Sequence, residues 1–287
     1  MYHLKFAKTY DFAIIQENHL KHVLEDSYSI KDGVFCVADG VTRDRLDGKA
    51  TVYPQTLEEA IDLIEHYPNP SGAAIVAQIC SNTFASSLAN ELEVSEKKIL
   101  EIVKKINQEI AKINQGRKID YIKNDYYGCV AIGGVIQDDI LYCFAIGDCV
   151  IRTLDNDYNI LFDTSASTIE MSLTPYRQPF LLRHIYKEKW NWNNGKCRRF
   201  YRKHVRNNPI RLMMRKYTFG VLTGQQSAIS FVKTYTVPLE RVKYILAYSD
   251  GCSECLKGKN AIKEVINNPE IIQKEKHEKT LIIYEKI

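Results

Sequence analysis

The sequence predicts an α+β fold in which buried strands alternate with a pair of helices. Two short apolar stretches, at 33–40 and 244–251, are rich in β-branched and aromatic residues, and each ends in an Asp-Gly pair. Between them, the segments 71–92 and 95–113 are long enough for helices and have apolar residues at helical spacing. No linker rich in Pro, Gly or Ser interrupts the chain, so we expect residues 1–287 to form a single domain.

Composition limits the class of protein. The chain is 45% hydrophobic and 26% charged, which is enough apolar material for a sizeable core. No run approaches the roughly 18 consecutive apolar residues of a membrane span, and the N-terminus lacks the long apolar stretch of a secretory signal. The 8 cysteines are scattered, several of them inside apolar runs, as is typical of buried reduced thiols. We therefore expect a cytoplasmic protein with no membrane partner.

The stretches 33–40 and 244–251 each predict a strand that ends in a candidate metal ligand. In the first, the apolar residues predict a buried strand whose end presents the carboxylate of Asp39, and Gly40 lets the backbone turn tightly there. The stretch 244–251 repeats the plan and presents Asp250. We expect the two carboxylates to meet at one edge of the core and share a hard divalent cation such as Mg²⁺ or Mn²⁺.

The N-terminal part is expected to supply two strands, at about 12–15 and 20–30, with Asn18-His19 as the turn between them. Adjacent acids, Glu25 and Asp26, come shortly before the strand that ends in Asp39. Taken alone, such a pair is more often a polar edge than a site.

The helical segments carry their own start signals. Ser71 and Ser95 are candidate N-caps, because a Ser side chain accepts a hydrogen bond from a free amide of the first turn. The second segment has a period near 3.6 residues, and we expect one face of it to be core, with apolar residues at 99, 100, 103, 106, 110 and 113.

A third acid follows a hairpin pattern. Residues 127–136 and 140–146 are strand-like and flank a turn at 137–139. The second strand leads into Gly147-Asp148, and a further hairpin follows at 150–160. Gly-Asp is usually a simple turn, but its place at the end of an apolar strand keeps Asp148 as a candidate metal ligand.

Basic charge is concentrated in one window, 183–216. It holds twelve Lys or Arg and one acid, a net +11, so with +4 for the whole chain the remainder is −7. Trp190, Trp192, Phe200 and Tyr201 lie among the cations, and such interleaving can bind single-stranded nucleic acid. We favour a solvated surface insertion or flap instead, because no recognition motif is visible. Docking of an acidic or phosphorylated partner is an intermediate reading.

Several of these segments, taken in order, resemble the metal-dependent protein phosphatases of the PP2C (PPM) family. The resemblance spans nearly the whole chain and rests on Glu25-Asp26, the strand 34–40, the helix pair at 71–113, the hairpin through Gly147-Asp148, the stretch 247–251 and the closing segment 277–282. It implies a four-layer α-β-β-α sandwich, with two antiparallel sheets packed face to face and helices outside each.

The resemblance also implies roles for particular residues. Asp39 would bridge two Mn²⁺ or Mg²⁺ ions, the Gly40 carbonyl would hold the second and Asp250 the first. Asp148 would join Asp250 at a weaker third ion, and Glu25 and Asp26 would bind metal-bound waters. The implied activity is hydrolysis of phosphoserine or phosphothreonine in protein substrates by a metal-activated water.

The chain departs from the family pattern in ways that keep an alternative function open. Where the family closes its site with Asp, this sequence has His277 and Glu278, and a His ligand would shift preference from Mg²⁺ towards Mn²⁺. Lys21 stands where some members have a phosphate-binding Arg, and Arg43 is a candidate substitute. The alternative is a pseudophosphatase that uses the fold for binding or regulation. The enzyme is favoured, because a scaffold that needs no metal has no physical reason to keep acids at so many strand ends.

Overall fold

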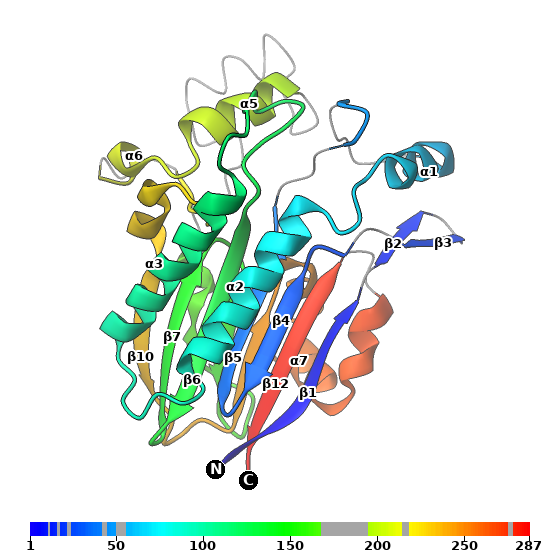
Figure 1. Ribbon diagram of the computed structural model, residues 1–287. Helices are drawn as coiled ribbons and strands as arrows, with labels where there is room; N and C mark the ends of the chain where they lie inside the picture. The colour runs from blue at the N-terminus through cyan, green and yellow to red at the C-terminus, as the bar shows by residue number, and fades with distance from the viewer. Residues whose placement is uncertain are drawn as a thin grey trace.

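A computed structural model describes residues 1–10, 12–15, 18–21, 24–41, 45–49, 56–167, 195–213, 218–274 and 278–287. Within these residues the chain forms two five-stranded antiparallel sheets and a separate hairpin (Figure 1). The first sheet has the order β1-β12-β11-β8-β9, with β1 Tyr2–Tyr10, β12 Lys279–Lys286, β11 Tyr244–Tyr248, β8 Val150–Leu154 and β9 Ile160–Asp163. The second has the order β10-β7-β6-β5-β4, with β10 Lys233–Pro238, β7 Ile140–Ile146, β6 Cys129–Gln137, β5 Val34–Gly40 and β4 Ser27–Lys31. The hairpin pairs β2 Phe12–Ile15 with β3 Asn18–Lys21.

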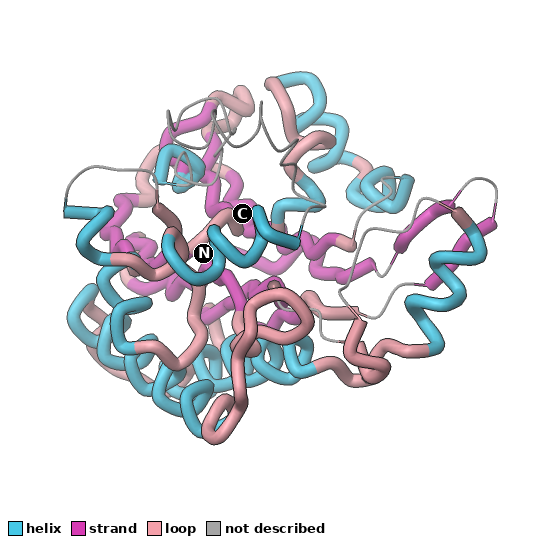
Figure 2. Tube along the Cα trace, turned by 90° about the horizontal axis from the view of Figure 1, so that it is seen from above, coloured by secondary structure: helices cyan, strands magenta, loops and turns pink. Residues whose placement is uncertain are grey.

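Helices cover the outer face of each sheet, and Figure 2 shows them on both sides of the strands. Helices α2 (Gly72–Leu88) and α3 (Glu96–Ile113) pack on the second sheet through a cluster that includes Phe84, Ile106 and Phe144. The two sheets meet in another cluster, and α7 (Lys259–Asn267) packs on the first sheet in a further one. These apolar interfaces define four layers, which confirms the α+β sandwich expected from the sequence.

The strong local signals of the sequence are confirmed residue by residue. Ser71 caps α2 by accepting from the Ala74 amide at 3.0 Å, and Ser95 caps α3 by accepting from the Lys98 amide at 3.2 Å. The hairpin between β6 and β7 turns at Asp138-Asp139, both of which have positive φ, as a two-residue hairpin loop requires.

Other N-terminal expectations were wrong. Asn18 and His19 are not a turn: they belong to β3 and pair with Ile15 and Ile14. The segment 20–30 is not one strand either, because β3 ends at Lys21 and β4 begins at Ser27, leaving Glu25-Asp26 between them. This break occurs because Glu25 and Asp26 are held by partners in other elements, as described below.

Elements with weak sequence signals were not anticipated. They are β1, which lies at a sheet edge and has only its last side chain buried, helix α1 (Leu57–Glu65), β10 and α7.

The basic window is not wholly a solvated surface. Helices α5 (Gly195–His204) and α6 (Pro209–Met213) lie within it, joined by residues 205–208, and residues 183–194 and 214–216 fall outside the described residues. Arg206 is buried and donates to both carboxylate oxygens of the buried Asp125 at 2.7 and 2.8 Å. Arg202 pairs with the same carboxylate at 3.2 Å. The expected flap is therefore anchored by a charge pair that sequence reasoning missed.

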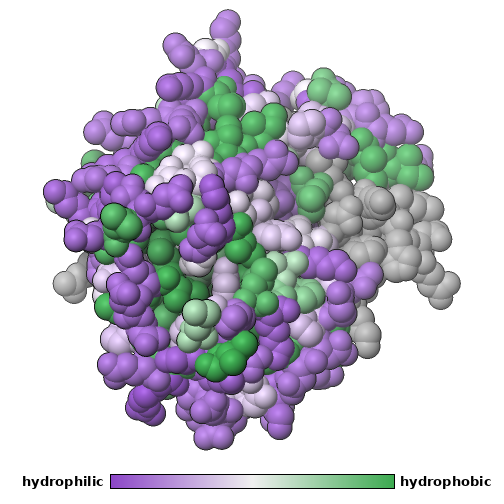
Figure 3. All heavy atoms as spheres, turned by 60° about the horizontal axis from the view of Figure 1, so that its bottom comes forward, coloured by the Kyte–Doolittle hydropathy of each residue, from purple (hydrophilic) through white to green (hydrophobic). Residues whose placement is uncertain are grey.

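The chain ends meet at the far end of the sandwich, where the Ile287 amide donates to the Met1 carbonyl at 3.1 Å. That end is largely hydrophilic, with smaller groups of apolar side chains among the polar ones (Figure 3), as on ordinary protein surfaces. Among the described residues, no helix has both the length and the apolar character needed to cross a bilayer.

Candidate metal centre

The acids singled out in the sequence come from segments that end or begin at the same end of the two sheets. Asp39 is the penultimate residue of β5, Asp250 follows β11, and Asp148 lies between β7 and β8. Glu25-Asp26 precede β4, and Glu278 immediately precedes β12. Antiparallel pairing brings these strand ends to one end of the sandwich, opposite the end at which the chain termini lie (Figure 1).

The carboxylates are close enough to repel one another. Burial and then the negative charges of Asp26, Asp250, Asp148 and Glu278 raise the pKa of Asp39 well above its usual range. One electrostatic cluster therefore contains the acids from both Asp-Gly motifs.

Two other members of the cluster show the same effect. Burial, opposed in part by hydroxyl hydrogen bonds and reinforced by Asp250, raises the pKa of Asp26 to about 7. Burial and the charge of Asp250 raise the pKa of Asp148 to about 7 as well. Burial and mutual repulsion therefore both disfavour keeping these carboxylates charged without a cation.

Exposure decreases from one side of the cluster to the other. Asp250 is exposed, Asp39, Asp148 and Glu278 are partly buried, and Glu25 and Asp26 are buried. The arrangement is a recess whose outer acids face solvent and whose innermost acids are enclosed.

Glu25 is held at the inner end by hydroxyl donors. Tyr67 and Ser71 donate to the same carboxylate oxygen, Oε1, at 2.6 and 2.7 Å. Ser71 is also the N-cap of α2, so the start of that helix and the position of Glu25 depend on one side chain. Sequence reasoning found the cap but missed its second role, since nothing in the local sequence links residue 71 to residue 25.

Asp26 is fixed by the Ser of the second Asp-Gly motif. The Ser249 hydroxyl donates to Asp26 Oδ2 at 2.6 Å and accepts from the Thr280 amide at 2.9 Å. This chain of hydrogen bonds ties the segment before β4 to the ends of β11 and β12.

Glu278 closes the cluster in a particular way. Its Oε1 accepts from the backbone amides of both Glu25 and Asp26, so the carboxylate fixes the loop that carries them. Gly251 lets the chain after β11 pass close to the Glu278 backbone, because a Cβ there would lie 2.0 Å from the Glu278 carbonyl oxygen.

Asp148 is presented by a sharp bend. The preceding Gly147 has a φ of +83°, which disfavours any residue with a Cβ, and a Cβ there would lie 2.2 Å from the side chain of Val130. The bend sends the chain from β7 in one sheet to β8 in the other, and places Asp148 between them.

The donor set fits hard divalent cations. Carboxylate oxygens are the ligands preferred by Mg²⁺ and Mn²⁺. Burial and then mutual repulsion raise the pKa values of Asp26, Asp39 and Asp148, and bound positive charge would offset both effects.

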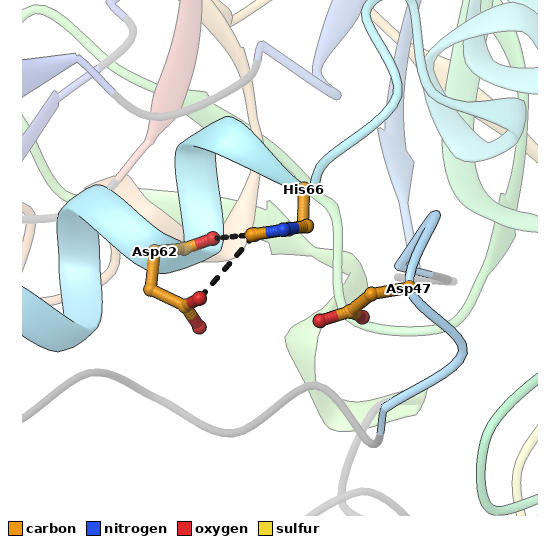
Figure 4. A group of neighbouring side chains, drawn as sticks. All are labelled: Asp47, Asp62 and His66. Atoms are coloured by element: carbon orange, nitrogen blue, oxygen red, sulfur yellow. Dashed lines mark hydrogen bonds and ion pairs between the residues drawn. The ribbon is translucent and has the colours of Figure 1, made fainter.

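A second acidic group, Asp47, Asp62 and His66, also has ligand atoms close together (Figure 4). Here the positive charge is already supplied by Arg45, whose Nη2 donates to Asp47 and to Asp62 at 2.7 Å. Arg45 accordingly lowers the pKa of both aspartates, the opposite of the shift in the strand-end cluster. This group is an ion-pair network and is not a candidate for the metal centre.

Some expected site residues lie beyond what the structure describes. His277 and Arg43 fall outside the described residues, and of Lys21 the backbone alone is described, at the end of β3. Their parts in the site remain predictions. Gly40 is buried at the end of β5, opposite Cys129 in β6.

The raised pKa values predict an unusual pH dependence for the metal-free protein. In the folded protein the pKa values of Asp26 and Asp148 are raised from the ordinary 3.8 to about 7, so both groups bind protons more tightly than in the unfolded chain. Their protonation stabilises the folded state at low pH, and this contribution is lost as pH rises towards 7. We expect the melting temperature in EDTA to be higher near about pH 5 than near about pH 8. Differential scanning fluorimetry measures this, and Asp148→Asn should flatten the profile. A melting temperature that rises steadily from about pH 5 to about pH 8 would contradict the cluster geometry.

A family model described as protein phosphatase 2C matches residues 70–281. Among solved structures, a serine/threonine phosphatase of S. agalactiae is 14% identical, with a TM-score of 0.57 and 100% of each chain covered. A bacterial serine phosphatase is 13% identical at a TM-score of 0.57, with 99% of this chain and 98% of the other covered. The catalytic domain of serine threonine protein phosphatase PstP, solved with two manganese ions, is 13% identical at a TM-score of 0.51, with 99% of each chain covered. No curated protein matches the chain. At these identities, the likeness to solved structures establishes the fold.

Proposed function

Because the chain belongs to the protein phosphatase 2C family, we propose that it is a metal-dependent serine/threonine phosphoprotein phosphatase. The observation that supports this proposal most directly is the cluster of mutually repelling carboxylates at one end of the sandwich. Its members are Glu25, Asp26, Asp39, Asp148, Asp250 and Glu278.

In this proposal Asp39 and Asp250, with the Gly40 carbonyl, would hold two Mn²⁺ or Mg²⁺ ions, and Asp148 with Asp250 would hold a weaker third ion. Bound cations would supply positive charge against the phosphate oxygens and activate a water for in-line attack. Glu25 and Asp26 orient water at the inner end, where Tyr67, Ser71 and Ser249 hold them rigidly.

No protein nucleophile is needed for this chemistry. Of the seven cysteines whose side chains the structure describes, those at 36, 80, 129, 143, 149 and 252 are buried, and Cys255 is partly exposed. The buried thiols fill the apolar clusters between layers, which suits a structural role.

One observation favours the pseudophosphatase as a second candidate. One Glu278 oxygen already accepts hydrogen bonds from the amides of Glu25 and Asp26. The side chain therefore holds that loop in place, in addition to any part it has in binding a metal. If His277 were not a ligand, the centre would bind metal more weakly than in a relative that has Asp at this position. Such a protein would keep the fold and bind a phosphorylated partner without turnover.

Hydrolysis of p-nitrophenyl phosphate by the purified protein separates the two candidates. We expect turnover with Mn²⁺ or Mg²⁺, none in EDTA, and loss of at least about a hundredfold in Asp250→Asn, since a metal ligand is removed. A stronger response to Mn²⁺ would support His277 as a ligand.

Asp157→Asn is the matched control for that assay, because Asp157 is an exposed aspartate in the turn between β8 and β9. It should retain wild-type turnover. A cooperatively melting protein with no turnover in either metal would favour the pseudophosphatase.

A further inference from the structure

A cavity of about 370 Å³ adjoins the acid cluster. Asp148 and Asp250 line one side of it, and Arg152, Lys257, Ser165 and Ser253 contribute to the rest of the lining. The cavity therefore joins the outer acids of the candidate metal centre to cations and hydroxyls.

The floor of the cavity is rigid. Arg152 projects from β8 and donates to Asp163 through Nε and Nη2 at 2.8 Å, while its Nη1 donates to the Leu256 carbonyl at 3.0 Å. Its guanidinium also lies 5.8 Å from the ring centre of Tyr248, which lines the same cavity. Arg152 is thus a fixed positive group on strands that also lead to Asp148 and Asp250.

The rim carries a cation that is free to change partners. Lys257 pairs with Glu254 at 2.5 Å, and the two side chains are 68% and 69% exposed. Ion pairs this exposed contribute little to stability, so another carboxylate can replace Glu254 as the partner of Lys257.

We propose that this cavity receives an acidic side chain of the protein substrate, close in sequence to the phosphorylated residue. The inference rests on the proposed phosphatase function, which puts the phosphoryl group at the neighbouring acids. There Asp148 and Asp250 would be committed to cations, which leaves Lys257 and the hydroxyl of Ser253 to hydrogen-bond an incoming carboxylate. A basic side chain would instead meet the positive charges of Arg152 and Lys257.

The test uses paired phosphoserine peptides that differ only in carrying Glu or Gln on both sides of the phosphoserine. We expect the wild-type protein to show a kcat/KM for the Glu peptide about threefold to tenfold above that for the Gln peptide, mainly through KM, as rim charges typically contribute. Lys257→Glu should reverse the preference and leave p-nitrophenyl phosphate hydrolysis unchanged, since that substrate has no flanking residue. Lys259→Glu is the matched control, because Lys259 is an exposed lysine two positions away that does not line the cavity.

Binding provides a readout that does not depend on turnover. Fluorescence anisotropy with labelled peptides containing a non-hydrolysable phosphonate of serine should give the same Glu-over-Gln preference, reversed in Lys257→Glu. Equal affinities, or a preference that survives Lys257→Glu, would overturn the subsite. Failure of p-nitrophenyl phosphate hydrolysis together with a normal binding preference would instead count against the phosphatase and retain the acidic-residue subsite.

Discussion

Asp39→Asn is expected to abolish metal-dependent hydrolysis and, at the same time, to make the metal-free protein more stable. Asp39 lies at the centre of the cluster. Besides burial, the charges of four other acids raise its pKa, namely Asp26, Asp250, Asp148 and Glu278. Replacing its charge with a neutral amide of the same shape removes this repulsion but also removes the proposed bridging ligand. We expect a loss of at least about a thousandfold in kcat/KM, comparable to removing a group that stabilises the transition state directly.

The two effects are measured separately. Turnover of p-nitrophenyl phosphate in Mn²⁺ gives the first, and the melting temperature in EDTA near about pH 8 gives the second, where the carboxylates would otherwise be charged. Added Mn²⁺ should raise the melting temperature of the wild type more than that of Asp39→Asn, because ligand binding to the native state is stabilising. If Asp39→Asn retained activity, or lost stability in EDTA, the assignment of Asp39 to the centre of the cluster would fail.

Asp125→Ala is expected to destabilise the protein by about 3–5 kcal/mol, the usual cost of leaving a buried charge without its partner. Asp125 and Arg206 have side chains only 1% and 4% exposed, and both Arg206 donors bond to the two carboxylate oxygens at 2.7 and 2.8 Å. Removing the carboxylate leaves the Arg206 guanidinium buried without its partner, and Arg202 loses its ion pair as well. Helix α5 would lose the contact that anchors it to the loop before β6.

Urea unfolding followed by circular dichroism measures this loss. Asp62→Ala is a suitable control, because Asp62 also pairs with an arginine, Arg45, at 2.7 Å, but its side chain is 44% exposed. That variant should lose no more than about 1 kcal/mol. Similar losses in the two variants would contradict the view that the Asp125–Arg206 pair is the structural anchor of the basic window.

The sequence alone determined the architecture wherever one segment carried the whole signal. The strands Val34–Gly40 and Tyr244–Tyr248 are buried because their side chains are apolar, apart from Asp39 near the end of the first. The caps at Ser71 and Ser95 start helices through contacts three residues away. Such features depend on neighbours along the chain, which a sequence displays directly. The acids at the strand ends could be listed because each lies close to an apolar run in the sequence. The four-layer arrangement came from the resemblance of several segments to a known family.

Tertiary structure alone decided how those acids are held and what surrounds them. Tyr67 and Ser71 reach Glu25 across more than forty positions, Ser249 reaches Asp26 across 223, and Arg206 finds Asp125 across 81. The cavity beside Asp148 and Asp250 likewise combines strands and turns separated by roughly a hundred residues. These partners are ordinary polar residues with no local pattern. A buried carboxylate needs donors or a countercharge, but which residue supplies them depends on the packing of the layers, and so only the folded chain reveals it.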